Sequence, residues 1–530
     1  MPENPVHYIE IVYLFLLLMV VALAALARWL RTPYPIVLVL AGLALSFVPG
    51  IPKVSLDPQV VFFVILPPLI YSAAWLTSWT AFSHHLVSIV SLAVGLVVFT
   101  VFGVAFGAPL VIPGFDWRSG LVLGSVVSTT DAIAATAVAR RTGLPRRIGE
   151  TLEGESLAND ATGLLALQVA VGLVAGAGTP SAGTVAWRIA LLAGGGLAVG
   201  LVLAVVVDWF ERRIDDGPIE IAISILVPYA AYLAAETIHA SGVLAVVAAG
   251  LYLSHRSTHF YSASVRLEAW AVWNSLTFIF NGFVFALIGL SLQEVLGGIK
   301  DYPLGTLVWW GVLLTVVVIA LRLFWSFSAT HMNYFLRRRF FGQKEQTPNG
   351  REIFLIGWTG MRGVIALAAA LALPQTEPDG TPFPFRNVVV FLTFVVILLT
   401  LVVQGLTLPP VIRLLGLGGA DTTQQEEDEA RRIVLDAAIS HLERARAADR
   451  PEHSRVYDDL IGHARERLEP FGDESPETAM RVRYQEAIRE LLRVERDTAL
   501  RLREEGKVSD EVLRRLEREL DLTEARLRAP

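Results

Sequence analysis

The stretch GESLAND (residues 154–160) opens an apolar run, ATGLLALQVAVGLVAGAG, which continues to residue 178. About 20 apolar residues are enough to cross a bilayer as a helix. Inside such a span, each ionised side chain costs on the order of 3 kcal/mol or more. Glu155 and Asp160 therefore need either a partner or a function.

The spacing within GESLAND places its polar groups on one face of a helix. Glu155 and Asn159 are four residues apart, as are Ser156 and Asp160, so the four side chains share one stripe. This stripe offers carboxylate, hydroxyl and amide oxygens, which are ligands that suit hard cations such as Na⁺.

The composition around this stretch indicates an all-α polytopic membrane protein. The chain has 530 residues, of which 54% are hydrophobic and only 18% charged, and its mean hydropathy is +0.53. Apolar segments of suitable length predict about thirteen transmembrane helices. They lie at 8–28, 33–48, 59–76, 85–110, 118–139, 149–176, 185–209, 218–238, 241–254, 268–290, 305–330, 351–373 and 386–414. Residues 237–242 fit either a tight turn or a kink.

The distribution of Lys and Arg between the loops predicts the orientation. With an odd number of spans, one set of loops holds about fifteen of these residues and the other about five, and the richer set is expected in the cytoplasm. We therefore expect a multi-pass protein of the cell membrane with its N-terminus outside and its C-terminus in the cytoplasm. The chain has no Cys, which excludes disulfides, thiolate metal sites and cysteine nucleophiles.

A few ionisable residues fall inside the predicted spans, where they are candidates for function. These are Asp131, Glu155, Asp160, Glu236, Arg322 and Arg362. Asp131 and Asp160 lie near the predicted midplane, which favours an ion pathway. The alternative is a structural network in which the acids pair with the two arginines.

Two of the predicted spans contain residues that weaken a helix. STTD (128–131) has side chains that compete for backbone hydrogen bonds, and GWTGMRG (357–363) has three glycines around Arg362. Paired interrupted helices are typical of transporter binding sites. For the second stretch, close helix packing at glycine is an equally good interpretation.

The long apolar segments end at about residue 417. Residues 417–530 alternate charged and apolar residues at three- and four-residue steps, which predicts amphipathic helices in a cytoplasmic tail. We expect a helical hairpin or a small bundle there. A regulatory role is the alternative, and the sequence assigns the tail no ligand.

Five motifs together resemble the monovalent cation/proton antiporter family that includes the sodium/proton exchangers. The resemblance extends over the membrane part, within residues 1–416. The motifs are LPPLIYSAAW (66–75), STTD (128–131), GESLAND (154–160), AETIHASGVLAVVAAGLYL (235–253) and GMRGVIALAAALALP (360–374).

This resemblance implies an inverted-repeat antiporter fold with two broken, crossing helices, and a homodimer. It implies no enzyme activity, no cofactor beyond the transported Na⁺ and H⁺, and no nucleic-acid partner; membrane lipid would surround the protein. Asp160 resembles the family's shared cation/proton carboxylate. Asn159 resembles the residue associated with electroneutral exchange, and we expect it in the cation/proton-binding set with Asp160, Asp131, Ser156 and Thr130. The other implied roles are Na⁺ binding by Thr130, Asp131 and Ser156 together with Asp160, a structural ion pair between Glu155 and Arg322, and stabilisation of a broken helix by Arg362.

One position departs from the family pattern. Asp131 is followed by Ala132, where the family commonly has proline, and this leaves the extent of unwinding open. The predicted function is exchange of Na⁺ or Li⁺ for H⁺ by alternating access. K⁺/H⁺ exchange is the first alternative, because selectivity depends on ligand geometry, and an ion channel and an intramembrane hydrolase are weaker ones.

Overall fold

The computed structural model describes residues 5–49, 57–77, 79–131, 135–136, 146–175, 181–299, 302–340, 349–377, 380–417, 422–466, 476–505 and 507–528. The chain divides into two compact units, residues 1–421 and 422–530. Within the described residues, both units are helical, and the one strand-like feature is an antiparallel bridge between Thr376 and Pro382.

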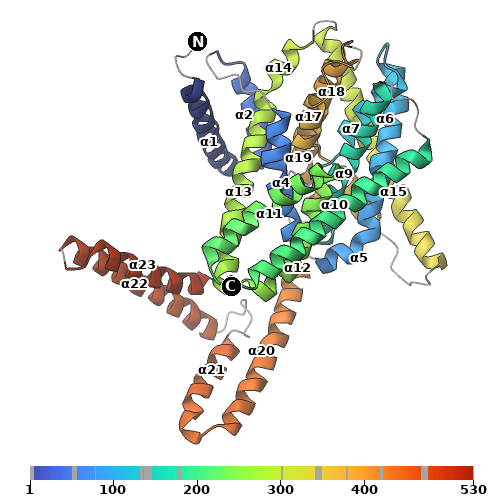
Figure 1. Cartoon of the computed structure of the whole chain (residues 1–530). Helices are drawn as coiled ribbons and strands as arrows, with labels where there is room; N and C mark the ends of the chain where they lie inside the picture. The colour runs from blue at the N-terminus through green and yellow to red at the C-terminus, as the bar shows by residue number, and fades with distance from the viewer. Residues whose placement is uncertain are drawn as a thin grey trace. The chain divides into compact units, whose positions relative to one another are not determined.

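The first unit begins with helices that follow most of the predicted spans (Figure 1), although the helix predicted at 118–139 ends at Ser128 and residues 132–134 and 137–139 of that span lie outside the described part of the chain. The N-terminal elements are α1 (Pro5–Trp29), α2 (Tyr34–Ser46), α3 (Pro58–Val60), the π-helix η1 (Val61–Ile65), α4 (Leu66–Leu76), α5 (Trp79–Val90), the π-helix η2 (Ser91–Leu96), α6 (Val97–Val111), α7 (Trp117–Ser128) and α9 (Arg146–Val174). The last of these carries GESLAND.

The remaining helices of this unit follow the prediction with small differences at their ends. They are α10 (Ala182–Glu211), α11 (Gly217–Thr237), α12 (Gly242–Phe260), α13 (Ala263–Leu290), α14 (Leu292–Gly297), α15 (Leu304–Phe340), α16 (Gly350–Trp358), α17 (Val364–Leu371), α18 (Arg386–Leu399), the π-helix η3 (Thr400–Gln404) and α19 (Gly405–Leu414). A turn separates α11 from α12, with His239 at φ 56°. The short α14 and the extension of α15 to Phe340 were not predicted.

Eight described helices are long and apolar enough to cross a membrane by themselves. The two interrupted spans do not reach that length, because α7 has 12 residues, α16 has 9 and α17 has 8. A count based on unbroken helices therefore gives fewer segments than the sequence pattern does. The protein is a multi-pass membrane protein surrounded by lipid.

Helix contacts form two groups in the first unit. In one group α2 packs on α13, α4 on α12, and α10 and α11 on α12. In the other, α7 packs on α6 and α9, α15 on α6, α16 and α18, and α17 on α18. The groups meet where α9 contacts α4 and α12 and where α17 contacts α13.

The second unit consists of two helical hairpins. One is α20 (Thr422–Ala448), the short 3₁₀ turn Pro451–His453 and α21 (Ser454–Glu466), and the other is α22 (Pro476–Glu504) with α23 (Asp510–Arg528) (Figure 1). Arg465 pairs with Glu443 at 3.0 Å across the first hairpin. At the turn, hydrogen bonds from the Arg450 backbone N–H and the Tyr457 hydroxyl hold the pKa of Asp449 below its ordinary value.

Candidate functional site

The two interrupted helices touch each other at their interruptions. Helix α7 ends at Ser128 and residues 129–131 are not helical, while residues 359–363 separate α16 from α17. The backbone N–H of Asp131 donates to the carbonyl oxygen of Met361 at 2.8 Å. The extent of unwinding beyond Asp131 depends on residues 132–134, which lie outside the described part of the chain.

Arg362 supplies hydrogen-bond donors to the buried backbone carbonyls at the end of α7. Its Nη1 donates to the carbonyl oxygens of Ser128 and of Thr129, the latter at 2.8 Å. Its own backbone N–H donates to the Thr400 hydroxyl at 3.1 Å. The last carbonyls of a helix lack partners within the helix and carry partial negative charge, so a buried guanidinium stabilises them.

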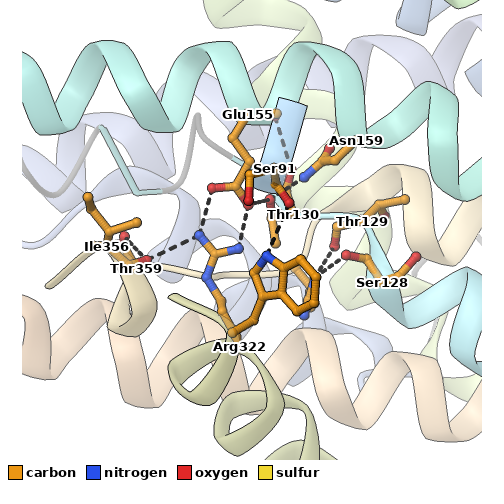
Figure 2. A network of polar contacts seen from close by, with 12 residues as sticks. Ser91, Ser128, Thr129, Thr130, Glu155, Asn159, Arg322, Ile356 and Thr359 are labelled. Carbon is orange, nitrogen blue, oxygen red and sulfur yellow. Dashed lines mark hydrogen bonds and ion pairs between the residues drawn. The ribbon is translucent and has the colours of Figure 1, made fainter. Parts of the chain in front are cut away.

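Glu155 and Arg322 form a bidentate ion pair between α9 and α15 (Figure 2). The Arg322 Nη1 donates to Glu155 Oε1, and Nη2 donates to Glu155 Oε2 at 2.8 Å and to the Ile356 carbonyl at 3.1 Å. Both side chains are only 1% exposed. Two parallel hydrogen bonds between charged groups fix both position and orientation, so this pair ties α9 to α15 and α16.

Thr130 connects the first interruption to GESLAND. Its hydroxyl donates to Glu155 Oε1 at 3.0 Å and accepts a hydrogen bond from Asn159 Nδ2 (Figure 2). Its carbonyl accepts a hydrogen bond from the Ser156 hydroxyl at 3.0 Å. Three residues of the α9 stripe thus hold Thr130 in place, which fixes the adjacent Asp131.

A cavity of about 480 Å³ reaches these residues from between the two helix groups. Its lining includes Thr130, Asp131, Ser156 and Asp160 on one side, and residues of α1, α2, α4 and α13 on the other. Asp160 is 7% exposed. The four residues expected to bind Na⁺ therefore face one space, and they offer carboxylate, hydroxyl and carbonyl oxygens.

The paired charges lie outside this lining. Among the described residues that line the cavity, the charged residues Glu155, Arg322 and Arg362 do not occur, and neither does Asn159, which was expected in the cation/proton-binding set. The sequence could not distinguish ligand from support within GESLAND, because all four of its polar residues share one stripe. In the structure Ser156 and Asp160 line the cavity, Ser156 also donates to the Thr130 carbonyl, and Glu155 and Asn159 hydrogen-bond to the Thr130 hydroxyl.

Two glycines of the second interruption allow the close approach that this arrangement needs. A Cβ atom at Gly363 would lie 2.5 Å from Asp131 Oδ2 and 2.6 Å from Asp131 Cβ, and one at Gly360 would overlap the Arg322 side chain. Any side chain at these positions would displace a charged residue of the site.

Several residues of the cavity and of the second interruption were not predicted from the sequence. Glu153 and Asn281 line the cavity, and Thr400 binds the backbone of Arg362. Glu153 could have been found, because it lies three residues before Ser156 and seven before Asp160, on the same helical stripe. Thr400 has no local signal. Among the described residues, no group of three or more His, Asp or Glu side chains is placed to hold a metal ion.

Interrupted helices that meet at buried charges beside a cavity define a membrane transporter of the crossed-helix class. The chain belongs to the sodium/hydrogen exchanger family: the family model for the transmembrane sodium/hydrogen exchanger matches residues 15–414. Members of this family are transporters and not enzymes.

Individual relatives agree with this assignment. An uncharacterized Na⁺/H⁺ exchanger of Mycobacterium tuberculosis is 32% identical over 97% of both chains. The sodium, potassium, lithium and rubidium/H⁺ antiporter of Bacillus subtilis is 33% identical over 71% of this chain and 57% of its own length. The structure of the sodium proton antiporter MjNhaP1 from Methanocaldococcus jannaschii at pH 8 shares the fold, with a TM-score of 0.60 and 20% identity over 77% of this chain and 99% of that one.

Proposed function

We propose that the chain exchanges Na⁺ or Li⁺ for H⁺ across the cell membrane by alternating access, with Asp160 as the shared site. The observation that supports this most is the placement of Asp160 with Asp131, Ser156 and Thr130 around one cavity. A buried carboxylate must be neutralised by a proton or balanced by a cation. These oxygen donors suit Na⁺.

Competition for Asp160 would couple the two ion fluxes. When the site holds Na⁺ it cannot hold the proton, and an empty, charged site is too costly to cross the barrier between the two sides. Each reorientation then carries either a cation or a proton. Asp131 contributes charge and an oxygen ligand, while the Glu155–Arg322 pair and Arg362 hold the two interruptions in position.

The exchange is proposed to be electroneutral, because Asp160 is preceded by Asn159 rather than by a second acid. Asn159 Nδ2 donates to the Thr130 hydroxyl, so its amide supports the site without adding a titratable charge. K⁺/H⁺ exchange remains the second candidate. It is favoured by the Bacillus subtilis relative, whose name includes potassium and rubidium.

We also propose how the two parts of the chain are arranged in the cell. Residues 1–416 form the antiporter domain of a homodimer in the cell membrane, with the N-terminus outside. Residues 417–530 form a cytoplasmic helical tail with a regulatory role. No cofactor takes part. Covalent crosslinking in native membranes tests the dimer, and truncation after residue 417 tests the tail.

Ion flux into liposomes tests the exchange. Purified protein is reconstituted with an acidic interior, and lumenal pH is followed when Na⁺, Li⁺ or K⁺ is added outside. We expect cation-dependent alkalinisation that is absent in Asp160→Asn, and the order of response identifies the cation. Exchange that persists in Asp160→Asn, or a conductance far above carrier turnover, would contradict the proposal.

A further inference from the structure

The π-helix η1 lies between two cavities of the first unit. Val61 and Ile65 line the cavity that contains Asp160. Phe62 and Phe63 line a second cavity of about 240 Å³, together with Leu164 and Gln168 of α9, Glu236 of α11 and Ala369 of α17. The two cavities adjoin successive turns of α9, one at Ser156 and Asp160 and the other at Leu164 and Gln168. One helical turn of five residues thus faces both.

The backbone hydrogen bonds of this turn are limited by the two prolines that follow it. The Leu66 backbone N–H donates to the Val61 carbonyl, five residues back instead of four. Pro67 and Pro68 follow, and proline has no N–H to donate. In an α-helix the carbonyls of Phe63 and Val64 would accept from residues 67 and 68, so both lose their helical donors.

A residue of another helix supplies the missing donor. The Tyr229 hydroxyl of α11 donates to the Val64 carbonyl at 3.0 Å. One turn further along α11, the Tyr232 ring packs edge-on against Phe63, with centroids 5.6 Å apart. Helix α11 therefore holds η1 by one hydrogen bond to its backbone and one contact to its side chain.

The other two π-helices of the described chain have comparable attachments. The Trp325 indole donates to the Ser91 carbonyl at the start of η2 at 3.1 Å. The Arg362 backbone donates to the Thr400 hydroxyl at the start of η3. π-turns cost more than α-turns and concentrate at functional sites. The hydrogen bonds to the Val64 and Ser91 carbonyls offset part of that cost at η1 and η2, whereas the bond at η3 reaches the Thr400 side chain.

We propose that η1 is the barrier between the two cavities and that Tyr229 is the positioning residue that holds this turn against α11. This inference rests on the proposed alternating access, for which the two cavities are the two half-pathways. A change from π to α register removes one residue from the turn and rotates the chain on one side by about 100°. Each residue on that side would then take the face of its neighbour in the chain, so Val61 and Phe62 would no longer face the cavities that they now line, and the barrier would open.

Cysteine accessibility tests the inference, because the chain contains no Cys. Ala73→Cys reports the cavity that contains Asp160, and Leu164→Cys reports the second cavity. Each is labelled with a membrane-impermeant maleimide applied to right-side-out and to inverted vesicles. All variants also carry Asp160→Asn, which is expected to abolish exchange. The labelling result therefore tests the barrier alone, and the exchange proposal is tested separately by ion flux.

With Tyr229 intact, we expect the two cysteines to react from opposite sides of the membrane. In the Tyr229→Phe variant, the Leu164→Cys thiol should react about tenfold faster with maleimide applied on the side from which Ala73→Cys is labelled. This factor is the one expected for the loss of one hydrogen bond. Tyr232→Phe is the matched control, because it retains the ring that contacts Phe63, and it should leave the sidedness unchanged.

A second variant acts on the same carbonyl from within the helix. Pro68→Ala gives the Val64 carbonyl an α-helical donor and should favour the α register even with Tyr229 present. Pro58→Ala is its control, because Pro58 lies at the start of α3, where no helical carbonyl requires its N–H. Unchanged sidedness in both Tyr229→Phe and Pro68→Ala would overturn the inference.

Discussion

The backbone N–H of Asp131 donates a hydrogen bond to the carbonyl oxygen of Met361 at 2.8 Å, so the two interrupted helices are joined at their interruptions. This contact holds the peptide of a proposed ion ligand against the backbone of the second interruption. The conformation of each break consequently depends on the other.

Gly363 is required for that contact. Gly363→Ala places a Cβ within 2.6 Å of Asp131 Cβ, so Asp131 must move and exchange should fall by at least about tenfold, because misplacement of about 1 Å at a site is that costly. Exchange in liposomes measures the effect. Gly172→Ala on α9 is the control, since its Cβ would meet nothing within 4 Å. Equal activity in the two variants would contradict this account.

Removal of Arg322 should destabilise the protein strongly. Arg322→Ala leaves the buried Glu155 carboxylate unpaired, which costs about 3–5 kcal/mol, and the thermal unfolding temperature in detergent should fall. Replacing both partners with Gln should recover part of that loss. The matched control is Arg515→Ala, whose partner Glu511 lies 2.7 Å away; the two side chains are 78% and 73% exposed. We expect it to cost less than about 1 kcal/mol.

Thr400 should support the second interruption through its hydroxyl. Thr400→Val removes the acceptor of the Arg362 backbone N–H, and a buried unsatisfied donor costs about 1–3 kcal/mol. Thr400→Ser retains the hydroxyl and should behave closer to the wild type. Thermal unfolding measures the difference, and indistinguishable Val and Ser variants would show that this hydrogen bond contributes little.

Competition at Asp160 predicts the direction of the pH dependence. Protons on the side from which Na⁺ binds occupy the same carboxylate, so lowering the pH there should raise the apparent KM for Na⁺ by up to about tenfold per pH unit. The maximal rate at saturating Na⁺ should change much less. Initial rates at fixed pH on the opposite side test this, and a KM independent of pH would exclude a shared site.

The sequence predicted most of the helices, because apolar runs bounded by charges are a strong signal in membrane proteins. Interruption of the two spans was also expected, from STTD and from the glycines around Arg362. The π-helices were not predicted, although LPPL was noted as a motif. Hydropathy averages over many residues and cannot detect a turn that is one residue longer.

The site was predicted less completely, for a physical reason. Asp131 lacks the following proline that would break a helix locally, yet α7 still ends at Ser128. Arg362 and Met361 supply hydrogen bonds to this backbone from distant parts of the chain. Contacts of this kind depend on the tertiary fold. Pairing of the buried acids with the two arginines was one interpretation of the residues, but the particular Glu155–Arg322 pair was expected from the resemblance to a family, since nothing in the spacing relates α9 to α15.

The central claim is that a cation and a proton compete for Asp160, and the most direct test is proton release on cation binding. Na⁺ is added to purified protein in weakly buffered detergent solution, and the released protons and the bound Na⁺ are both measured. Electroneutral exchange predicts about one proton released per Na⁺ bound and no release from Asp160→Asn. Na⁺ binding without proton release in the wild type, or equal release from Asp160→Asn, would contradict the account.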